Sequence, residues 1–133
     1  MTTDTDTSYV PGVCNINRAE IAYRRKAEYI GLISAALLFV GLLFTPIHPV
    51  VRAVLVFIPL FVGVIGYFQV KNRFCVSYGA SGKQNATPGS TSAAAVNNAV
   101  SKATDKRKAR SMNIKAALIS LVIVALSAVV PRF

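Results

Sequence analysis

The sequence predicts an all-α integral membrane protein with three transmembrane helices. Three stretches, residues 29–45, 53–70 and 116–130, contain no charged residue and are almost wholly apolar. Hydrophobic residues make up 53% of the chain and charged residues 15%, whereas an ordinary soluble domain has about a quarter charged residues. A soluble domain of 133 residues has too high a surface-to-volume ratio to cover three such stretches. We therefore expect one membrane domain, residues 15–133, after a disordered cytoplasmic tail, residues 1–14.

The first predicted element is a short surface helix, residues 15–28, that leads into the first span. Asn15 or Asn17 can cap this helix, because a short polar side chain accepts hydrogen bonds from the free amides of a first turn. The span itself, residues 29–45, is about 26 Å long as a helix, close to the roughly 30 Å hydrocarbon core of a bilayer.

The second span, residues 53–70, is expected to return antiparallel to the first. Pro46 and Pro49 end the first helix, since proline lacks an amide donor and its ring obstructs the preceding turn. Only a short link then remains between the two spans. Pro59 lies inside the second span and predicts a kink there.

A long polar loop, residues 71–113, connects the second and third spans. Its first part is rich in Gly and Ser and is typical of a flexible segment. Its second part, residues 91–111, is expected to form a basic amphipathic helix lying on the membrane surface. The third span, residues 114–130, is short, with Lys115 reaching back to the interface and Pro131 ending the helix.

The distribution of Lys and Arg predicts the orientation. Of the 15 Lys and Arg residues, all except Arg52 and Arg132 lie on the side of the N-terminus and the long loop. Because Lys and Arg accumulate on the cytoplasmic side of membrane spans, the N-terminus and loop are predicted to be cytoplasmic and the C-terminus extracytoplasmic.

Basic residues also predict a partner. The net charge is +10, which suits either nucleic acid or an anionic membrane surface. With three apolar spans in the same chain, we expect the bilayer with anionic headgroups and no nucleic acid. The residues expected to contact anionic lipid are Arg24, Arg25, Lys26, Lys102, Lys106, Arg107, Lys108 and Arg110.

The two cysteines are the candidates for chemistry. Cys14 precedes the first helix and Cys75 follows the second span, so both are placed near the cytoplasmic interface. They fit a redox pair, half of a metal site shared between two chains, or two reduced thiols, since the cytoplasm disfavours disulfides. The single histidine, His48, is placed on the far side of the membrane, and no cofactor is expected.

Small residues in the spans predict close helix packing. Gly31 and Ala35 are four residues apart in the first span, and Gly63 and Gly66 are three apart in the second. Small side chains let helix backbones approach in a membrane, where lipid supplies no hydrophobic drive for association. Packing within the chain is favoured over an interface with a partner.

Three groups of residues together resemble a group of uncharacterised small bacterial membrane proteins with three spans. The groups are Cys14-Asn15 with Glu20 and Arg24-Arg25, then Arg73-Phe74-Cys75 with Tyr78-Gly79 and Gly82, and the basic stretch before the last span. The resemblance implies a bacterial plasma membrane and gives no activity. It also implies that the two cysteine regions form one cytoplasmic unit.

Three functions remain as hypotheses. The three apolar stretches, residues 29–45, 53–70 and 116–130, contain no Asp, Glu, Lys, Arg or His, which argues against a proton-coupled carrier and against acid–base catalysis inside the bilayer. We therefore expect a non-enzymatic accessory or scaffold subunit of a larger membrane complex, in contact with other membrane subunits or with itself. The alternatives are an oligomeric pore or transport component, and a cytoplasmic-face thiol or metal sensor.

Overall fold

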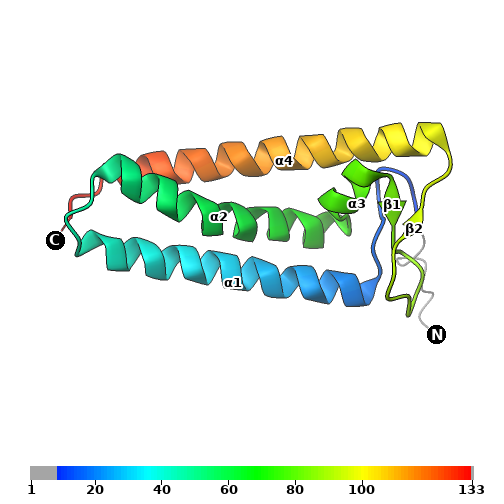
Figure 1. Cartoon of the computed structure of the whole chain (residues 1–133), viewed down its shortest axis with the longest axis horizontal. Coiled ribbons are helices and arrows are strands. Elements are labelled where there is room, and N and C mark those ends of the chain that lie inside the picture. Colours follow the sequence, from blue (N-terminus) through cyan, green and yellow to red (C-terminus); the bar gives the residue numbers. More distant parts are fainter. Residues whose placement is uncertain (1–8, 133) are drawn as a thin grey trace.

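Three long helices lie side by side in the computed structural model, which describes residues 9–132 (Figure 1). They are α1 (Arg18–Leu43), α2 (Pro49–Asn72) and α4 (Ala99–Ala128). Between α2 and α4 come a short helix, α3 (Val76–Ser81), and two very short antiparallel strands, β1 (Lys83–Gln84) and β2 (Ala94–Ala95). Each long helix is long and apolar enough to cross a membrane, so the coarse prediction of a helical chain with three helices able to span a bilayer is confirmed.

The expected surface helix and first span form one continuous helix, α1. Asn17 is its N-cap, and its Oδ1 accepts a hydrogen bond from the Glu20 amide at 3.0 Å. No proline interrupts the sequence between Arg18 and Leu43, which explains why the helix does not break where the charged segment meets the apolar one. The charged first turns therefore extend α1 along its own axis.

Helix α2 returns antiparallel to α1 after a short link (Figure 1). His48 is its N-cap, with Nδ1 accepting from the Val50 amide at 3.2 Å, and Pro49 takes the first helical position, where its missing amide costs nothing. The helix continues through Pro59 and ends at Arg73, whose φ of 51° is the left-handed conformation that closes many helices.

The expected surface helix 91–111 and the third span are likewise one helix, α4. Asn98 caps it by accepting from the Ser101 amide at 3.0 Å. Neither glycine nor proline occurs between Ala99 and Ala128, so the sequence offers no break between the basic half and the apolar half. The basic half therefore continues the line of the span instead of turning onto a surface (Figure 1).

Helix α2 lies between α1 and α4 (Figure 1). The contact with α1 is made by glycines: a Cβ added to Gly31 would lie 2.4 Å from the Gly63 nitrogen, and one added to Gly66 would lie 2.9 Å from the Glu28 nitrogen. The two backbones thus touch directly, as small residues allow in membrane helices.

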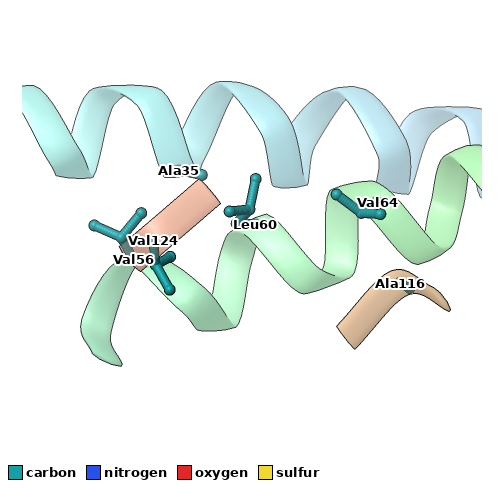
Figure 2. Close-up of a cluster of buried hydrophobic side chains, with 6 residues drawn as sticks. All are labelled: Ala35, Val56, Leu60, Val64, Ala116 and Val124. Carbon is teal, nitrogen blue, oxygen red and sulfur yellow. The ribbon is translucent and has the colours of Figure 1, made fainter. Parts of the chain in front are cut away.

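A buried apolar cluster joins all three long helices (Figure 2). Its members are Ala35 from α1, Val56, Leu60 and Val64 from α2, and Ala116 and Val124 from α4. Most other large apolar side chains of the spans point outward, as expected for helices whose solvent is lipid.

Candidate functional site

The polar cap, residues 9–17 and 73–98, lies over one end of the three long helices, where α1 and α4 begin and α2 ends (Figure 1). Of the expected tail, residues 1–8 fall outside the described part of the chain. The remaining residues, 9–14, are folded: Val10 and Cys14 exchange backbone hydrogen bonds of 2.9 Å. The cap contains both cysteines, so the two regions that the resemblance groups together form one unit.

Asn15 joins the N-terminal segment to the segment after α2. Its Oδ1 accepts from the Cys75 amide at 2.6 Å, and its Nδ2 donates to the Cys75 carbonyl at 3.1 Å. Its backbone also donates to the Arg73 carbonyl at 3.1 Å and accepts from the Asn85 amide at 2.7 Å. Asn15 is fully buried, so these four bonds satisfy groups that water cannot reach.

Asn17 and Asn85 fasten the loop that follows β1. Asn17 Nδ2 donates to the carbonyls of Thr87 and Ser90, at 2.9 and 3.0 Å. Asn85 Nδ2 donates to Glu20 Oε1 at 3.1 Å. Buried amides therefore take the place of a regular sheet in holding this irregular segment.

A cluster of Glu20, Arg24, Cys75 and Tyr78 lies beside these amides. Arg24 donates from Nη2 to Cys75 Sγ at 3.1 Å and pairs through Nη1 with Glu20 Oε2 at 3.0 Å. Tyr78 donates to Glu20 Oε1 at 3.1 Å. Burial and the neighbouring Glu20 carboxylate raise the pKa of the Tyr78 hydroxyl above its ordinary value. The cluster is thus a linked set of charge-assisted hydrogen bonds around one thiol.

An open depression of about 410 Å³ lies over this cluster. Tyr23 and Tyr78 flank the Arg24 guanidinium, whose carbon is 5.2 and 5.9 Å from the two ring centres. Ser90 and Thr91 also line the depression. Cys75 itself is only 2% exposed, so its thiol lies beneath Arg24 and out of direct reach of solvent.

Asp105 attaches the N-terminal segment to α4. Its Oδ2 accepts from the Tyr9 hydroxyl and its Oδ1 from the Gly12 amide, both at 2.7 Å. Burial and the bond to the Asp105 carboxylate raise the pKa of the Tyr9 hydroxyl. Ala109 and Met112, one and two turns further along α4, pack with Phe74. These contacts keep the basic half of α4 against the cap.

The structure does not join the two cysteines. Both are buried and neither is in a disulfide; Cys14 donates to the Ile16 carbonyl at 3.5 Å while Cys75 accepts from Arg24. Within residues 9–132, no group of three or more His, Cys, Asp or Glu residues is arranged to hold a metal ion. The arrangement of the two cysteines in a single chain therefore lends no support to the redox-pair or the shared-metal interpretation.

The basic residues expected to contact lipid occupy different environments. Arg24 is half-buried in the cluster, and Lys108 donates to Asn72 Oδ1 at 3.1 Å. The others are exposed: Arg25, Lys26, Lys102, Lys106, Arg107 and Arg110. The four small residues expected to pack helices, Gly31, Ala35, Gly63 and Gly66, are all buried in the helix contacts described above.

Two structural roles escape a reading of the sequence. Asp105 stands among Lys102, Lys106 and Arg107, where a lone acid in a basic stretch is a weak signal of a buried partner. Arg52, which the sequence presents only as a charge on the far side, is in fact buried at the end of α4.

No protein-family model, no curated protein and no solved structure matches this chain.

Proposed function

We propose that this chain is a non-enzymatic accessory or scaffold subunit of a larger membrane assembly. The proposal places it in the bacterial plasma membrane, with the N-terminus and the polar cap in the cytoplasm and the C-terminus outside. The distribution of Lys and Arg along the sequence supports this orientation, since the basic segments lie in the cap and in the adjoining halves of α1 and α4, and the opposite end carries Arg52 and Arg132.

An open apolar groove between α2 and α4 carries the proposal. It has a volume of about 460 Å³, and all of its lining residues are apolar, among them Ala53, Ala125 and Ala128. It runs along the parts of both helices that are apolar enough to lie in the bilayer. Small residues on a lipid-facing surface favour backbone approach by another helix. We assign the groove to a transmembrane helix of a partner protein.

The polar cap also supports a scaffold role. Its buried amides, Asn15, Asn17 and Asn85, hold segments that are distant in sequence, and the Glu20 carboxylate joins them. Polar side chains that could perform chemistry are thereby engaged in internal bonds. A cap built in this way presents a fixed shape at the membrane surface, which is what a scaffold requires.

Groove filling tests the partner. Ala125→Leu adds a larger side chain to the groove, and Ala36→Leu makes the same change at an exposed position of α1. We expect the wild type and Ala36→Leu, purified from native membranes in mild detergent, each to carry one other membrane protein in stoichiometric amount. A photo-crosslinker placed at position 58, in the groove, should capture that same protein. Ala125→Leu should lose it. A lone monomer in all three samples would overturn the proposal, and a pure homo-oligomer would favour the pore alternative.

The continuity of α4 limits which basic residues meet lipid. Lys102 and Lys115 are about 20 Å apart along the helix axis, whereas a headgroup layer is about 5–8 Å thick. For a helix crossing near the membrane normal, Arg107 and Arg110 reach the headgroups with their long side chains and Lys102 stands in water. Arg110→Gln should reduce enrichment of spin-labelled phosphatidylglycerol around the protein, and Lys102→Gln should not. Equal enrichment in both variants would contradict this placement.

A thiol sensor is the second candidate, and the 3.1 Å contact between Arg24 and Cys75 favours it. Modification of Cys75 would displace Arg24 and disturb its pairing with Glu20. Under this proposal an oxidant alters the proteolysis of the cap in wild type and in Cys14→Ser, and Cys75→Ser abolishes the response. An unchanged response in Cys75→Ser removes the candidate.

A further inference from the structure

A cavity of about 550 Å³ lies at the end of the molecule opposite the polar cap. The link between α1 and α2, the first turn of α2 and the chain after α4 surround it. Three basic side chains line it, His48, Arg52 and Arg132, and no carboxylate occurs among its described lining residues. Its volume is within the range of about 300–1,000 Å³ that is usual for small-molecule sites.

Arg52 is the central feature of this cavity. It is only 1% exposed, and its Nη2 donates to the carbonyls of Ser127 and Val130 at 3.1 and 2.7 Å. Its guanidinium carbon lies 5.7 Å from the ring centre of Phe39. Its Nε is also buried and has no acceptor among the described residues. A buried guanidinium with a donor left unpaired is costly, so a ligand that supplies the missing acceptor would bind favourably.

The surroundings of Arg52 select the charge of that ligand. The last carbonyls of α4 offer a partial negative charge but no full counterion. The first turn of α2 adds the positive end of its helix dipole. His48 uses Nδ1 to accept from the Val50 amide, which leaves Nε2 as the ring's donor. Donors and positive charge therefore converge on one cavity.

Guanidinium groups match oxyanions better than spherical ions, because their donors are planar and forked. The position of the cavity narrows the choice further. Arg52 directly precedes the predicted second span and Arg132 follows the third, so the proposed topology puts the cavity near the membrane interface, where phospholipid phosphates lie. We propose that this cavity binds a phosphate-type oxyanion, supplied either by the headgroup of an anionic phospholipid or by free phosphate.

Binding of free phosphate is measured on the full chain in a neutral detergent. Thermal unfolding is followed as sodium phosphate replaces sodium chloride at constant ionic strength, so that general screening is held fixed. The variant Arg132→Gln removes one donor from the cavity, and Lys83→Gln removes the same charge from an exposed position of the cap. We expect the wild type and Lys83→Gln to bind phosphate with the same apparent affinity. Arg132→Gln should bind phosphate at least about tenfold more weakly.

Retention of lipid is measured by native mass spectrometry from nanodiscs that contain phosphatidylcholine and phosphatidylglycerol. Retention of one phosphatidylglycerol by the wild type and Lys83→Gln, but not by Arg132→Gln, identifies the headgroup as the source. A phosphate response without such retention identifies the free ion. If neither ligand distinguishes Arg132→Gln from Lys83→Gln, the proposal is overturned. His48→Gln serves as a second cavity variant should Arg132→Gln fail to fold, and the same comparison with Lys83→Gln decides.

Discussion

Replacing Gly31 with alanine tests the contact on which the helix order depends. An added Cβ would lie 2.4 Å from the Gly63 nitrogen, 2.7 Å from the Gly63 Cα and 2.8 Å from the Pro59 carbonyl oxygen. All three atoms belong to the backbone of α2. No side-chain rotation can relieve these overlaps, so α1 and α2 must separate to restore ordinary contact distances.

The magnitude follows from two opposing effects. Overpacking of this kind costs about 1–3 kcal/mol. Alanine is also a better helix former than glycine, by roughly 0.5–1 kcal/mol. Gly41→Ala isolates the second effect, because Gly41 lies in the same helix and a Cβ there meets nothing within 4 Å. The difference between the two variants should therefore equal the packing cost alone, about 1–3 kcal/mol.

Thermal unfolding measures this difference. The two cysteines are buried and the chain has no tryptophan, so a thiol-reactive dye is a suitable reporter in detergent micelles. We expect Gly31→Ala to melt several degrees below Gly41→Ala, since about 1 kcal/mol corresponds to a few degrees in a chain of this size. Equal melting temperatures for Gly31→Ala and Gly41→Ala would refute direct backbone contact between α1 and α2.

Two further predictions concern the polar cap. Asn15→Ala leaves the buried Cys75 amide without its acceptor, at about 1–3 kcal/mol, whereas the Cys75 carbonyl keeps its bond from the Gly79 amide. Hydrogen exchange of the Cys75 amide should accelerate at least tenfold in Asn15→Ala and not in the exposed control Asn97→Ala; equal protection in both would show that Asn15 does not hold the cap. Because the pKa of Tyr9 is raised by burial and by Asp105, its neutral form stabilises the fold fully below about pH 10 and this stabilisation is lost at higher pH. Tyr9→Phe should therefore lose less stability than the wild type as pH rises above 10, and parallel pH profiles would contradict this.

The spans could be predicted because composition and length alone determine them. An uncharged apolar stretch of about 17 residues has few stable environments besides a membrane, and Pro46 and Pro49 mark the turn between the first two. The continuity of α1 and α4 was also present in the sequence, as the absence of a helix breaker. The change from charged to apolar residues instead predicts a boundary that the helices do not have. Composition changes mark the edge of a bilayer, whereas helices end where the backbone requires it.

The assembly of the cap could not be predicted in this way. Tyr9 and Asp105 are 96 residues apart, and Asn15 and Cys75 are 60 apart. Such pairs have no periodicity and no spacing rule, and they form only after the helices have brought their ends together. Residue type alone predicts that Asn15 or Asn17 caps the first helix. Asn17 is the cap, and Asn15 instead pairs with the backbone of Cys75.

Buried charged groups need hydrogen-bond partners, and the two ends of the molecule differ in how fully they supply them. This difference explains why the ligand site is inferred at one end. At the cap, the buried charge of Asp105 is matched by the donors of Tyr9 and Gly12. Among the described residues the cap leaves Asn85 Oδ1 without a partner, but that atom belongs to a neutral amide, and its cost is about 1–3 kcal/mol. Glu28 Oε2 in α1 is also unpaired among these residues, but Glu28 packs against Gly66 and lines neither the cavity nor the depression described above. At the opposite end the unpaired donor belongs to the charged guanidinium of Arg52, for which the penalty of burial is larger. An anion entering from outside the chain relieves that penalty, and the residues that would admit it already line the cavity.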